Sequence, residues 1–484
     1  MLFAGLDLGT SGVRVTAVDE HGKIAASASR SADFSVACEN GVEQDPEAWW
    51  RETLAVLGEL AFALKKNGRS PEELSALGVT STSGTLVVLD KKLRPLRPAI
   101  MYSDVRAADA AKFVQNAGRA HASRHGYAFN ASFAITKAAW LASAEPETFG
   151  KAAHFVHPAD FIVGRLAGEL ASDYSTSLKM GYDLLSDHWP GFIARKLGIS
   201  SAALPRVVAP GEPVGTILLD VAAQTGLSPA TQVAPAGSDG VAAFAASGAR
   251  RPGDWASSLG TTLVLKSIAD DLVKDPDGRV YCHRHPDGFW IPGGASSTGA
   301  AWVNARFGDA DAAALATLFN AASSRTPTGL LVYPLVGRGE RFPFLNPEAE
   351  GFIAGRPADR AELFAAHMEG TAFVERWCLD VLAQLGAPTG GELFTVGGAT
   401  REDAWLQIRA NVLGRPLAVP DVPEATSFGA AVIAASKAAY GSLSEASEAM
   451  VRVGRVVEPR EEAVAAYREK YRKFRHACAA IGYA

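Results

Sequence analysis

The sequence predicts an α/β fold built from two related domains, and three observations support this prediction. The first is a strand–turn–strand pattern over residues 2–24, in which apolar residues alternate at period two around a glycine-rich turn. The second is a similar pattern over residues 255–266, about half a chain later. The third is the length of 484 residues with 48% hydrophobic residues, which allows two domains to bury a core each.

The turn of the first pattern has the chemistry of an anion site. Gly9 and Gly12 permit a tight turn whose backbone N–H groups can face an anion, and Thr10 and Ser11 add hydroxyl donors. Asp7 ends the first strand, where a carboxylate can hold Mg²⁺ beside phosphate oxygens. An ordinary hairpin accounts for the same residues, because Gly-Thr-Ser-Gly is also common turn chemistry.

The second pattern repeats this turn. An apolar strand over 255–259 leads into Gly260, Thr261 and Thr262, and a second apolar strand follows. Two hydroxyl-bearing turns, one in each half, indicate two related domains that face a shared nucleotide across a central cleft. A further strand ends in Gly397 and Gly398, where missing side chains let the backbone approach a flat base closely.

Together these segments resemble the FGGY carbohydrate kinases of the actin-like (ribonuclease-H-like) ATPase superfamily. LDLGTSGVRV is similar to the family's first phosphate motif, SLGTT to its second, and GGATREDAWLQIRANVLGRPL with EATSFGAA to its adenosine motif. The motifs follow in family order from residue 1 to about residue 440. The resemblance implies two actin-like ATPase domains with a central cleft, which we place at residues 1–247 and 248–484.

The same resemblance implies ATP and Mg²⁺ as cofactors. Asp7 is the expected metal ligand, directly or through water, and also lies on the substrate side of the expected site. The expected nucleotide contacts are Thr10, Ser11, Gly260, Thr261, Thr262, Gly397 and Gly398.

Asp239 is the expected catalytic residue. It lies between a strand expected over 231–236 and an apolar helix expected over 241–246. Aspartate at such a corner commonly caps the helix. In the family, the Asp of this glycine-rich corner abstracts the proton of the sugar hydroxyl, so the resemblance implies a base that also contacts the sugar.

Two further segments form the sugar side of the expected site. The loop over 80–85 carries small hydroxyls that suit a polyol, or that satisfy the backbone groups of a turn. Many xylulose kinases have Met-His here, whereas Thr-Ser-Gly-Thr resembles the D-ribulose kinases of plants and cyanobacteria. By that resemblance, Ser83 of this chain is expected to contact the sugar. Asp104 and Arg106 match the family's Trp-x-Asp-x-Arg string, with Tyr102 replacing Trp. They contact sugar hydroxyls or pair with each other.

The expected function is ATP-dependent phosphorylation of a terminal hydroxyl of a ketopentose, with D-ribulose first and D-xylulose second. Another ketose or polyol, such as a hexulose, glycerol or erythritol, is an alternative. An actin-like nucleotide-binding switch without kinase activity is a remoter one, and such a switch would not need a base aimed at a sugar. A Rossmann dehydrogenase has little support, because no GxGxxG opens a strand–helix unit.

Composition limits the partners. The net charge of −5 and the absence of a basic run argue against nucleic acid. The sequence has no apolar run of membrane-spanning length and no leader pattern, so we expect no membrane partner and a cytoplasmic protein. The four cysteines show no CxxC spacing and are expected to be reduced thiols. A sugar and ATP are the expected partners, and a homodimer is left open.

Overall fold

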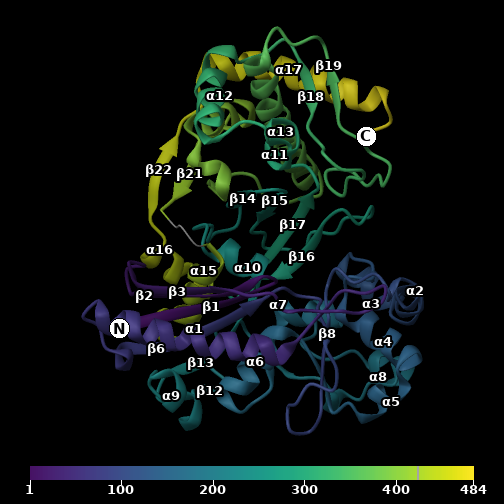
Figure 1. The fold of residues 1–484 in the computed structure, drawn as a ribbon. Coiled ribbons are helices and arrows are strands. Elements are labelled where there is room, and N and C mark those ends of the chain that lie inside the picture. The colour runs from purple at the N-terminus through teal and green to yellow at the C-terminus, as the bar shows by residue number, and fades with distance from the viewer. Residues whose placement is uncertain (422–424, 484) are drawn as a thin grey trace. The chain divides into compact units, whose positions relative to one another are not determined.

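The computed structural model describes residues 1–421 and 425–483, and the chain divides into two compact units (Figure 1). Unit 1 comprises Met1–Arg250, His283–Gly288 and Val422–Arg452, and unit 2 comprises Arg251–Cys282, Phe289–Asp421 and Val453–Ala484. The predicted α/β class with two domains is confirmed. The expected boundary after residue 247 is near the end of the first stretch of unit 1. A single boundary does not describe the two later segments that return to this unit.

Unit 1 is built on a mixed sheet with the strand order β12-β13-β6-β1-β2-β3. The hairpin partners β1, β2 and β3 are antiparallel, whereas β6 runs parallel to both β1 and β13. The strands are β1 (Leu2–Gly9), β2 (Gly12–Asp19), β3 (Ile24–Ser31), β6 (Leu74–Ser81), β12 (Gly215–Thr216) and β13 (Gln232–Ser238). Smaller sheets are formed by β4 (Ser35–Val36), β5 (Glu43–Gln44) and β8 (Ala99–Ile100), by β7 (Val87–Leu89) and β9 (His154–Val156), and by β10 (Ala171–Asp173) and β11 (Arg206–Val208).

The helices of unit 1 either cover the faces of this sheet or pack on one another beside it. They are α1 (Pro46–Lys66), α2 (Ala108–Ala117), α3 (Arg119–His125), α4 (Ala134–Ala144), α5 (Pro146–Lys151), α6 (Pro158–Ala167), α7 (Tyr174–Ser177), α8 (Gly191–Leu197), α9 (Leu219–Thr225), α10 (Asp239–Ala245), α15 (Ala425–Ala435) and α16 (Leu443–Met450). Helix α1 begins as its sequence predicts, because Asp45 accepts a hydrogen bond from the Glu47 N–H and Pro46 occupies the first turn.

The period-two pattern of β1 assigns its two faces. Leu2, Ala4, Leu6 and Leu8 share a core with apolar residues of α1. On the other face, a Cβ on Gly5 would lie 2.0 Å from the Ser427 carbonyl oxygen of α15, so only glycine allows this contact. Figure 1 shows α1 and α15 on opposite faces of the sheet. Asp7 shares the parity of Gly5 and lies on the α15 face.

Unit 2 repeats the sheet of unit 1. Its strand order is β16-β17-β15-β14-β20-β21-β22, in which β14 is antiparallel to β15 and parallel to β20. The strands are β14 (Trp255–Leu259), β15 (Leu263–Ser267), β16 (Tyr281–Arg284), β17 (Trp290–Ser296), β20 (Leu393–Val396), β21 (Leu417–Pro420) and β22 (Val453–Val457), with β18 (Leu331–Tyr333) and β19 (Phe352–Ala354) in a separate pair. When the unit 2 sheet is taken in the order from β22 to β17, its strands correspond one by one to the unit 1 strands from β12 to β3. In this correspondence, β14 and β15 match β1 and β2.

The core of unit 2 is rich in aromatic residues, including Trp255, Trp302, Trp377 and Trp405. The helices are α11 (Ala301–Phe307), α12 (Ala312–Arg325), α13 (Arg360–Gln384), α14 (Asp403–Leu413) and α17 (Glu461–Ala480), and the short helix η4 (Gly398–Arg401) follows β20. Helix α13 is buried along most of its length, as its apolar sequence predicts. None of the helices in the described part of the chain combines the length and apolar character that crossing a bilayer requires.

Candidate active site

Three parallel strands of unit 1 end at one edge of its sheet and present polar groups there. Asp7 on β1 is paired with Thr80 on β6, and Ser81 at the end of β6 is paired with Ser238 at the end of β13. Asp239 follows as the first residue of α10. Because only β6 separates β1 from β13, the backbones that carry Asp7 and Asp239 lie roughly 10 Å apart. The carboxyl ends of parallel strands are where such sheets bind ligands.

Asp7 has the chemistry of a magnesium ligand. Its side chain is largely buried, and one oxygen lies 3.8 Å from Arg14 Nη1 on the paired strand. Mg²⁺ in phosphoryl-transfer sites is held by one or two carboxylates with phosphate oxygens and water, so a single carboxylate beside the predicted phosphate turn fits this ion.

The turn between β1 and β2 exposes Thr10 and Ser11, as the sequence predicts. Gln44 supports this turn from behind, because its Nε2 donates to the Thr10 carbonyl oxygen at 2.9 Å. The indole N–H of Trp49 in turn donates to Gln44 Oε1 at 3.0 Å. Sequence reasoning missed this support, although the signal was present in the polar residue two positions before the helix-starting Pro46.

The corner that carries Asp239 is held by two polar residues. The Gly237 N–H donates to Asp173 Oδ2 at 3.0 Å, and Thr80 Oγ1 donates to the Gly237 carbonyl oxygen at 2.7 Å. Gly237 has φ +75°, a left-handed conformation that favours glycine. Burial raises the pKa of Asp173 to about 6, and its hydrogen bonds with Thr176 and Gly237 oppose this shift.

Ser238, not Asp239, occupies the N-cap position of α10, so the cap explanation of Asp239 is not needed. Asp239 is half-buried, and its Oδ1 accepts the Gly240 N–H at 2.7 Å. A carboxylate in the first turn of a helix is stabilised in its charged form by the helix dipole. The side chain is therefore placed at the sheet edge, where the dipole of α10 favours its charged form.

The sugar-side residues fall into two groups. Ser83 is half-buried and lies two residues beyond β6, so it leaves the same edge of the sheet as Asp7 and Asp239. Asp104 and Arg106 pair with each other, with Arg106 Nη2 2.7 Å from Asp104 Oδ2. Asp104 Oδ2 also accepts the Val42 N–H at 2.8 Å.

Arg106 is further held by Glu43, at 2.5 Å, and lies with its guanidinium carbon 4.9 Å from the ring centroid of Trp140. Burial acts to raise the pKa of Asp104, but the bonds from Arg106 and Val42 outweigh it and lower the pKa below its ordinary value. Of the two roles that the sequence left open, the ion pair is formed; a sugar contact stays a prediction.

In unit 2 the predicted nucleotide residues gather at the equivalent edge. The β14–β15 turn exposes Thr261 and Thr262, with Gly260 half-buried beside them. Gly397 follows β20 with φ +97°, and a Cβ there would lie 2.6 Å from the carbonyl oxygen of Leu259, directly before the turn. Gly398 opens into space, because a Cβ at this position would meet no atom within 4 Å. Glu424, which begins the EATSFGAA motif, lies outside the described residues.

The loop that precedes α11 locks onto this turn. The Ala300 N–H donates to the Gly260 carbonyl oxygen at 2.8 Å, and the Ala301 N–H to that of Thr261 at 3.3 Å. Glu340, which is 2% exposed, accepts from the Ser297 N–H at 2.6 Å and from the hydroxyls of Ser296 and Thr298 at 3.0 and 2.8 Å. Glu340 therefore braces the loop that supports the β14–β15 turn.

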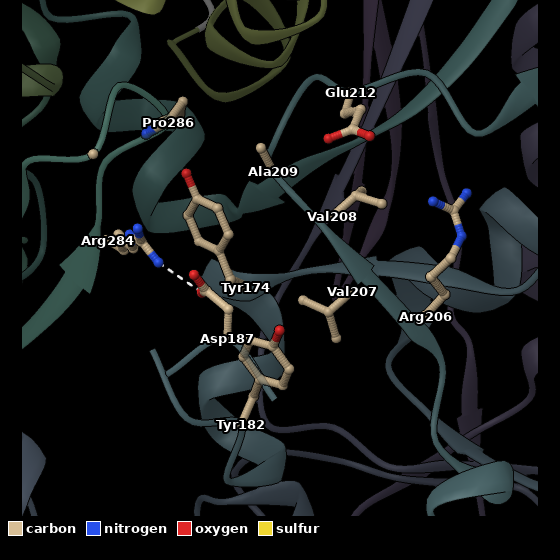
Figure 2. Close-up of a pocket in the computed structure, with 11 residues that line it drawn as sticks. Tyr174, Tyr182, Asp187, Arg206, Val207, Val208, Ala209, Glu212, Arg284 and Pro286 are labelled. Atoms are coloured by element: carbon tan, nitrogen blue, oxygen red, sulfur yellow. Dashed lines mark hydrogen bonds and ion pairs between the residues drawn. The ribbon is translucent and has the colours of Figure 1, made fainter. Parts of the chain in front are cut away.

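A pocket of about 450 Å³ lies within unit 1, and its described lining contains none of the predicted site residues. Figure 2 shows the ion pair between Arg284 and Asp187, 2.6 Å apart, beside the ring of Tyr174. Tyr174 donates its hydroxyl to the His285 carbonyl oxygen at 3.0 Å. These polar groups satisfy one another, and we assign the pocket no role in phosphoryl transfer.

Comparison with known proteins agrees with the resemblance found in the sequence. Residues 2–246 match the N-terminal domain, and residues 255–438 the C-terminal domain, of the FGGY family of carbohydrate kinases. The xylulose kinase of Streptomyces coelicolor is 32% identical over 443 residues, covering 90% of this chain and 87% of that protein. The xylulose kinase of Bacillus subtilis is 26% identical over 473 residues, covering 96% and 94%.

Solved structures give the same result at the level of the fold. The crystal structure of xylulose kinase from Rhodospirillum rubrum matches with a TM-score of 0.88 and 28% identity, covering 99% of both chains. The two family matches together span most of the sequence. This chain therefore belongs to the FGGY family of carbohydrate kinases, phosphotransferases whose acceptor is an alcohol group.

Proposed function

We propose that the protein phosphorylates a terminal hydroxyl of a ketopentose with ATP and Mg²⁺, and that D-xylulose is the sugar. The observation that supports this reaction is the position of Asp7 and Asp239 at the same edge of the unit 1 sheet, at the ends of β1 and β13. The choice of sugar is supported by the relatives reported above, which are named as xylulose kinases.

The proposed roles follow from what phosphoryl transfer requires, which is positioning and charge neutralisation more than covalent chemistry. Asp7 holds Mg²⁺, directly or through water, and the ion neutralises charge on the phosphates. Thr10 and Ser11 in unit 1, and Gly260, Thr261 and Thr262 in unit 2, donate hydrogen bonds to phosphate oxygens. Gly397 and Gly398 leave room for the adenine ring.

Asp239 accepts the proton of the attacking hydroxyl. A carboxylate is a weak base for an alcohol, but in a loose transition state the proton can leave late. In the first turn of α10, the helix dipole favours the charged carboxylate, which is the form that accepts a proton. Ser83, Asp104 and Arg106 are the proposed sugar contacts, with the ion pair of Asp104 and Arg106 able to offer both a donor and an acceptor.

D-Ribulose is the second candidate, favoured by Thr82 and Ser83 in place of the Met-His of many xylulose kinases. It is the first sugar predicted from the sequence, and the relatives reported above do not support it. Because Thr82 and Ser83 are smaller than Met and His, the loop after β6 offers the sugar more space and different hydrogen-bonding groups.

A panel of sugars tests the proposal. The purified protein is assayed for ADP release with D-xylulose, D-ribulose, a hexulose, glycerol and erythritol, at equal ATP and Mg²⁺. We expect the highest kcat/KM with D-xylulose. A higher value with D-ribulose would shift the assignment to the second candidate, and a higher value with a non-pentulose would overturn both.

A further inference from the structure

Two histidines and an aspartate form a buried cluster in unit 1. His121 and His125 lie one turn apart on α3, and Asp183 lies in the loop that follows the short helix over Leu178–Met180. All three side chains are buried, and one ligand atom from each lies within 4.8 Å of the other two. The sequence signal, His-x-x-x-His on a helix, was not used in predicting the function.

The distances fit a single small cation. His125 Nε2 is 3.2 Å from Asp183 Oδ1, and His121 Nδ1 is 3.8 Å from Asp183 Oδ2. Tetrahedral Zn²⁺ with bonds of about 2.0–2.1 Å to nitrogen and oxygen separates neighbouring ligand atoms by about 3.3 Å. The ion would therefore need only small side-chain movements to bind.

In metal-binding histidines, the ring nitrogen that does not bind the metal usually has a hydrogen-bond partner, and both histidines of this cluster show this arrangement. His125 Nδ1 lies 2.9 Å from the His121 carbonyl oxygen, so Nδ1 carries a proton and Nε2 is the atom directed at Asp183. In the part of the chain that the structure describes, this buried nitrogen makes no well-directed hydrogen bond, and Asp183 Oδ1 at 3.2 Å is its polar neighbour. His121 Nε2 lies 2.9 Å from the Tyr127 hydroxyl. Such outer partners fix the orientation of metal-binding histidines.

The carboxylate is oriented in the same way. Asp183 Oδ1 accepts the N–H groups of Leu185 and Ser186 at 3.0 and 3.2 Å. Arg124 Nη2 lies 3.0 Å from Oδ2, but the Arg124 side chain is 53% exposed and can turn to solvent when a cation takes its place.

We propose that His121 Nδ1, His125 Nε2 and Asp183 form a binding site for a divalent transition-metal ion, with Zn²⁺ the best match and water as the fourth ligand. Zn²⁺ accepts two imidazoles and one carboxylate as ligands, whereas Mg²⁺ prefers oxygen ligands and binds imidazole nitrogen poorly. The ion would tie α3 to the loop over 183–188. Asp187 in this loop pairs with Arg284 in the segment 283–288, at 2.6 Å. The role we assign is structural, and it does not depend on the sugar.

The test uses the full-length protein after treatment with a chelator, in excess Mg²⁺ so that oxygen-rich sites are occupied. Zn²⁺ is titrated by calorimetry, and Co²⁺ by visible absorption, which is strong for tetrahedral and weak for octahedral sites. We expect one ion per chain, a tetrahedral Co²⁺ spectrum and a higher thermal midpoint with Zn²⁺. No Zn²⁺ binding by the unaltered protein, or a weak octahedral spectrum, would overturn the proposal and leave a proton as the occupant.

Variants locate the site. His125→Gln and Asp183→Asn each remove a ligand and should lower Zn²⁺ affinity by more than about 100-fold, whereas Tyr127→Phe, which removes an outer partner, should cost about 10-fold. His367→Gln is the matched control. His367 Nδ1 also lies near a backbone carbonyl oxygen, at 2.8 Å from Leu363, and its buried Nε2 makes no hydrogen bond within residues 1–421 and 425–483. The described residues place it in no group of metal ligands.

His367→Gln should bind Zn²⁺ as the unaltered protein does. Equal affinity in the ligand variants and the control would place the ion elsewhere and refute the assignment. If His125→Gln fails to fold, the Co²⁺ spectrum of the unaltered protein and the Tyr127→Phe affinity still decide the question.

Discussion

Asp239 owes its position to main-chain geometry that other residues maintain. Gly237 turns the chain at the end of β13, Asp173 and Thr80 hold both of its peptide groups, and Asp239 then enters the first turn of α10. We expect Asp239→Asn to keep this geometry, because the amide oxygen can still accept the Gly240 N–H. It removes the negative charge of the carboxylate and with it the ability to accept a proton.

Phosphorylation of the sugar by Asp239→Asn should fall by about 10²–10⁴-fold, the usual contribution of a general base. Affinity for ATP, measured by calorimetry, and the thermal midpoint should stay close to those of the unaltered protein. Phosphorylation at the original rate would show that another group accepts the proton.

Lys137 gives a residue-scale prediction about pH. It is fully buried on α4, and its ammonium donates to the Ala131 carbonyl oxygen. Burial lowers the pKa of Lys137 to about 7, with Asp104 opposing and Lys179 adding to the shift. The folded protein therefore holds fewer protons than the unfolded chain between about pH 7 and the ordinary lysine pKa of about 10.4, so stability from this group rises with pH over that range.

In Lys137→Met this contribution disappears. The free energy of unfolding, measured with urea at pH 7, 8 and 9, should rise with pH less steeply in the variant, by up to about 1.4 kcal/mol per pH unit. Parallel pH profiles of the two proteins would mean that Lys137 stays charged in the folded state.

At the scale of elements, the loop over 296–300 supports the turn between β14 and β15, and Glu340 holds this loop in place. This carboxylate also accepts the Tyr333 hydroxyl at 2.8 Å and the Arg341 N–H at 2.9 Å. Glu340→Gln replaces an acceptor oxygen by a donor amide, which leaves buried donors unpaired. We expect the loop over 296–300 to loosen and the KM for ATP to rise by about 10-fold, with a smaller change in kcat.

Glu369→Gln is the control for this variant. Glu369 is 1% exposed in the same unit and accepts from Thr328, Tyr467 and Lys470, at 2.5–3.0 Å, rather than from the loop over 296–300. Because Glu369→Gln also breaks the buried ion pair with Lys470, it should lose about 3–5 kcal/mol of stability, without raising the KM for ATP. Equal KM changes in both variants would reduce the Glu340 effect to general destabilisation.

Elements with strong local patterns could be predicted from the sequence, whereas the distant residues that hold these elements in place could not. Period-two alternation and glycines predicted both hydroxyl-bearing turns, β1–β2 and β14–β15. The residues that hold the turns, Gln44 and Glu340, act through contacts with segments 34 or more positions away, which no local pattern encodes. The roles predicted for Ser83 and Asp239 rest on family motifs rather than on spacing.

The whole molecule has an order that the sequence does not show. Helix α15 follows β21 of unit 2 in the chain, yet it packs on β1 and α10 of unit 1. A sequence division into two consecutive domains assumes that each domain is continuous, so it cannot describe this return. The sequence signal for this packing is the cluster of small residues Gly429, Ala430 and Ala431. These residues allow another element to approach closely, but they do not indicate which element it is.

Gly5 tests this return at the level of the whole chain. A Cβ on Gly5 would lie 2.0 Å from the Ser427 carbonyl oxygen and 2.4 Å from the Ala431 nitrogen, so Gly5→Ala requires a backbone to move. Overpacking of this kind costs typically about 1–3 kcal/mol. We expect a lower thermal midpoint and faster hydrogen exchange in both β1 and α15, although 422 positions separate Gly5 from Ser427. Gly150→Ala is the control, because a Cβ there meets no atom within 4 Å and alanine favours its helix. Faster exchange confined to β1 would mean that α15 does not depend on this contact, and that unit 1 is complete without the segment over 425–452.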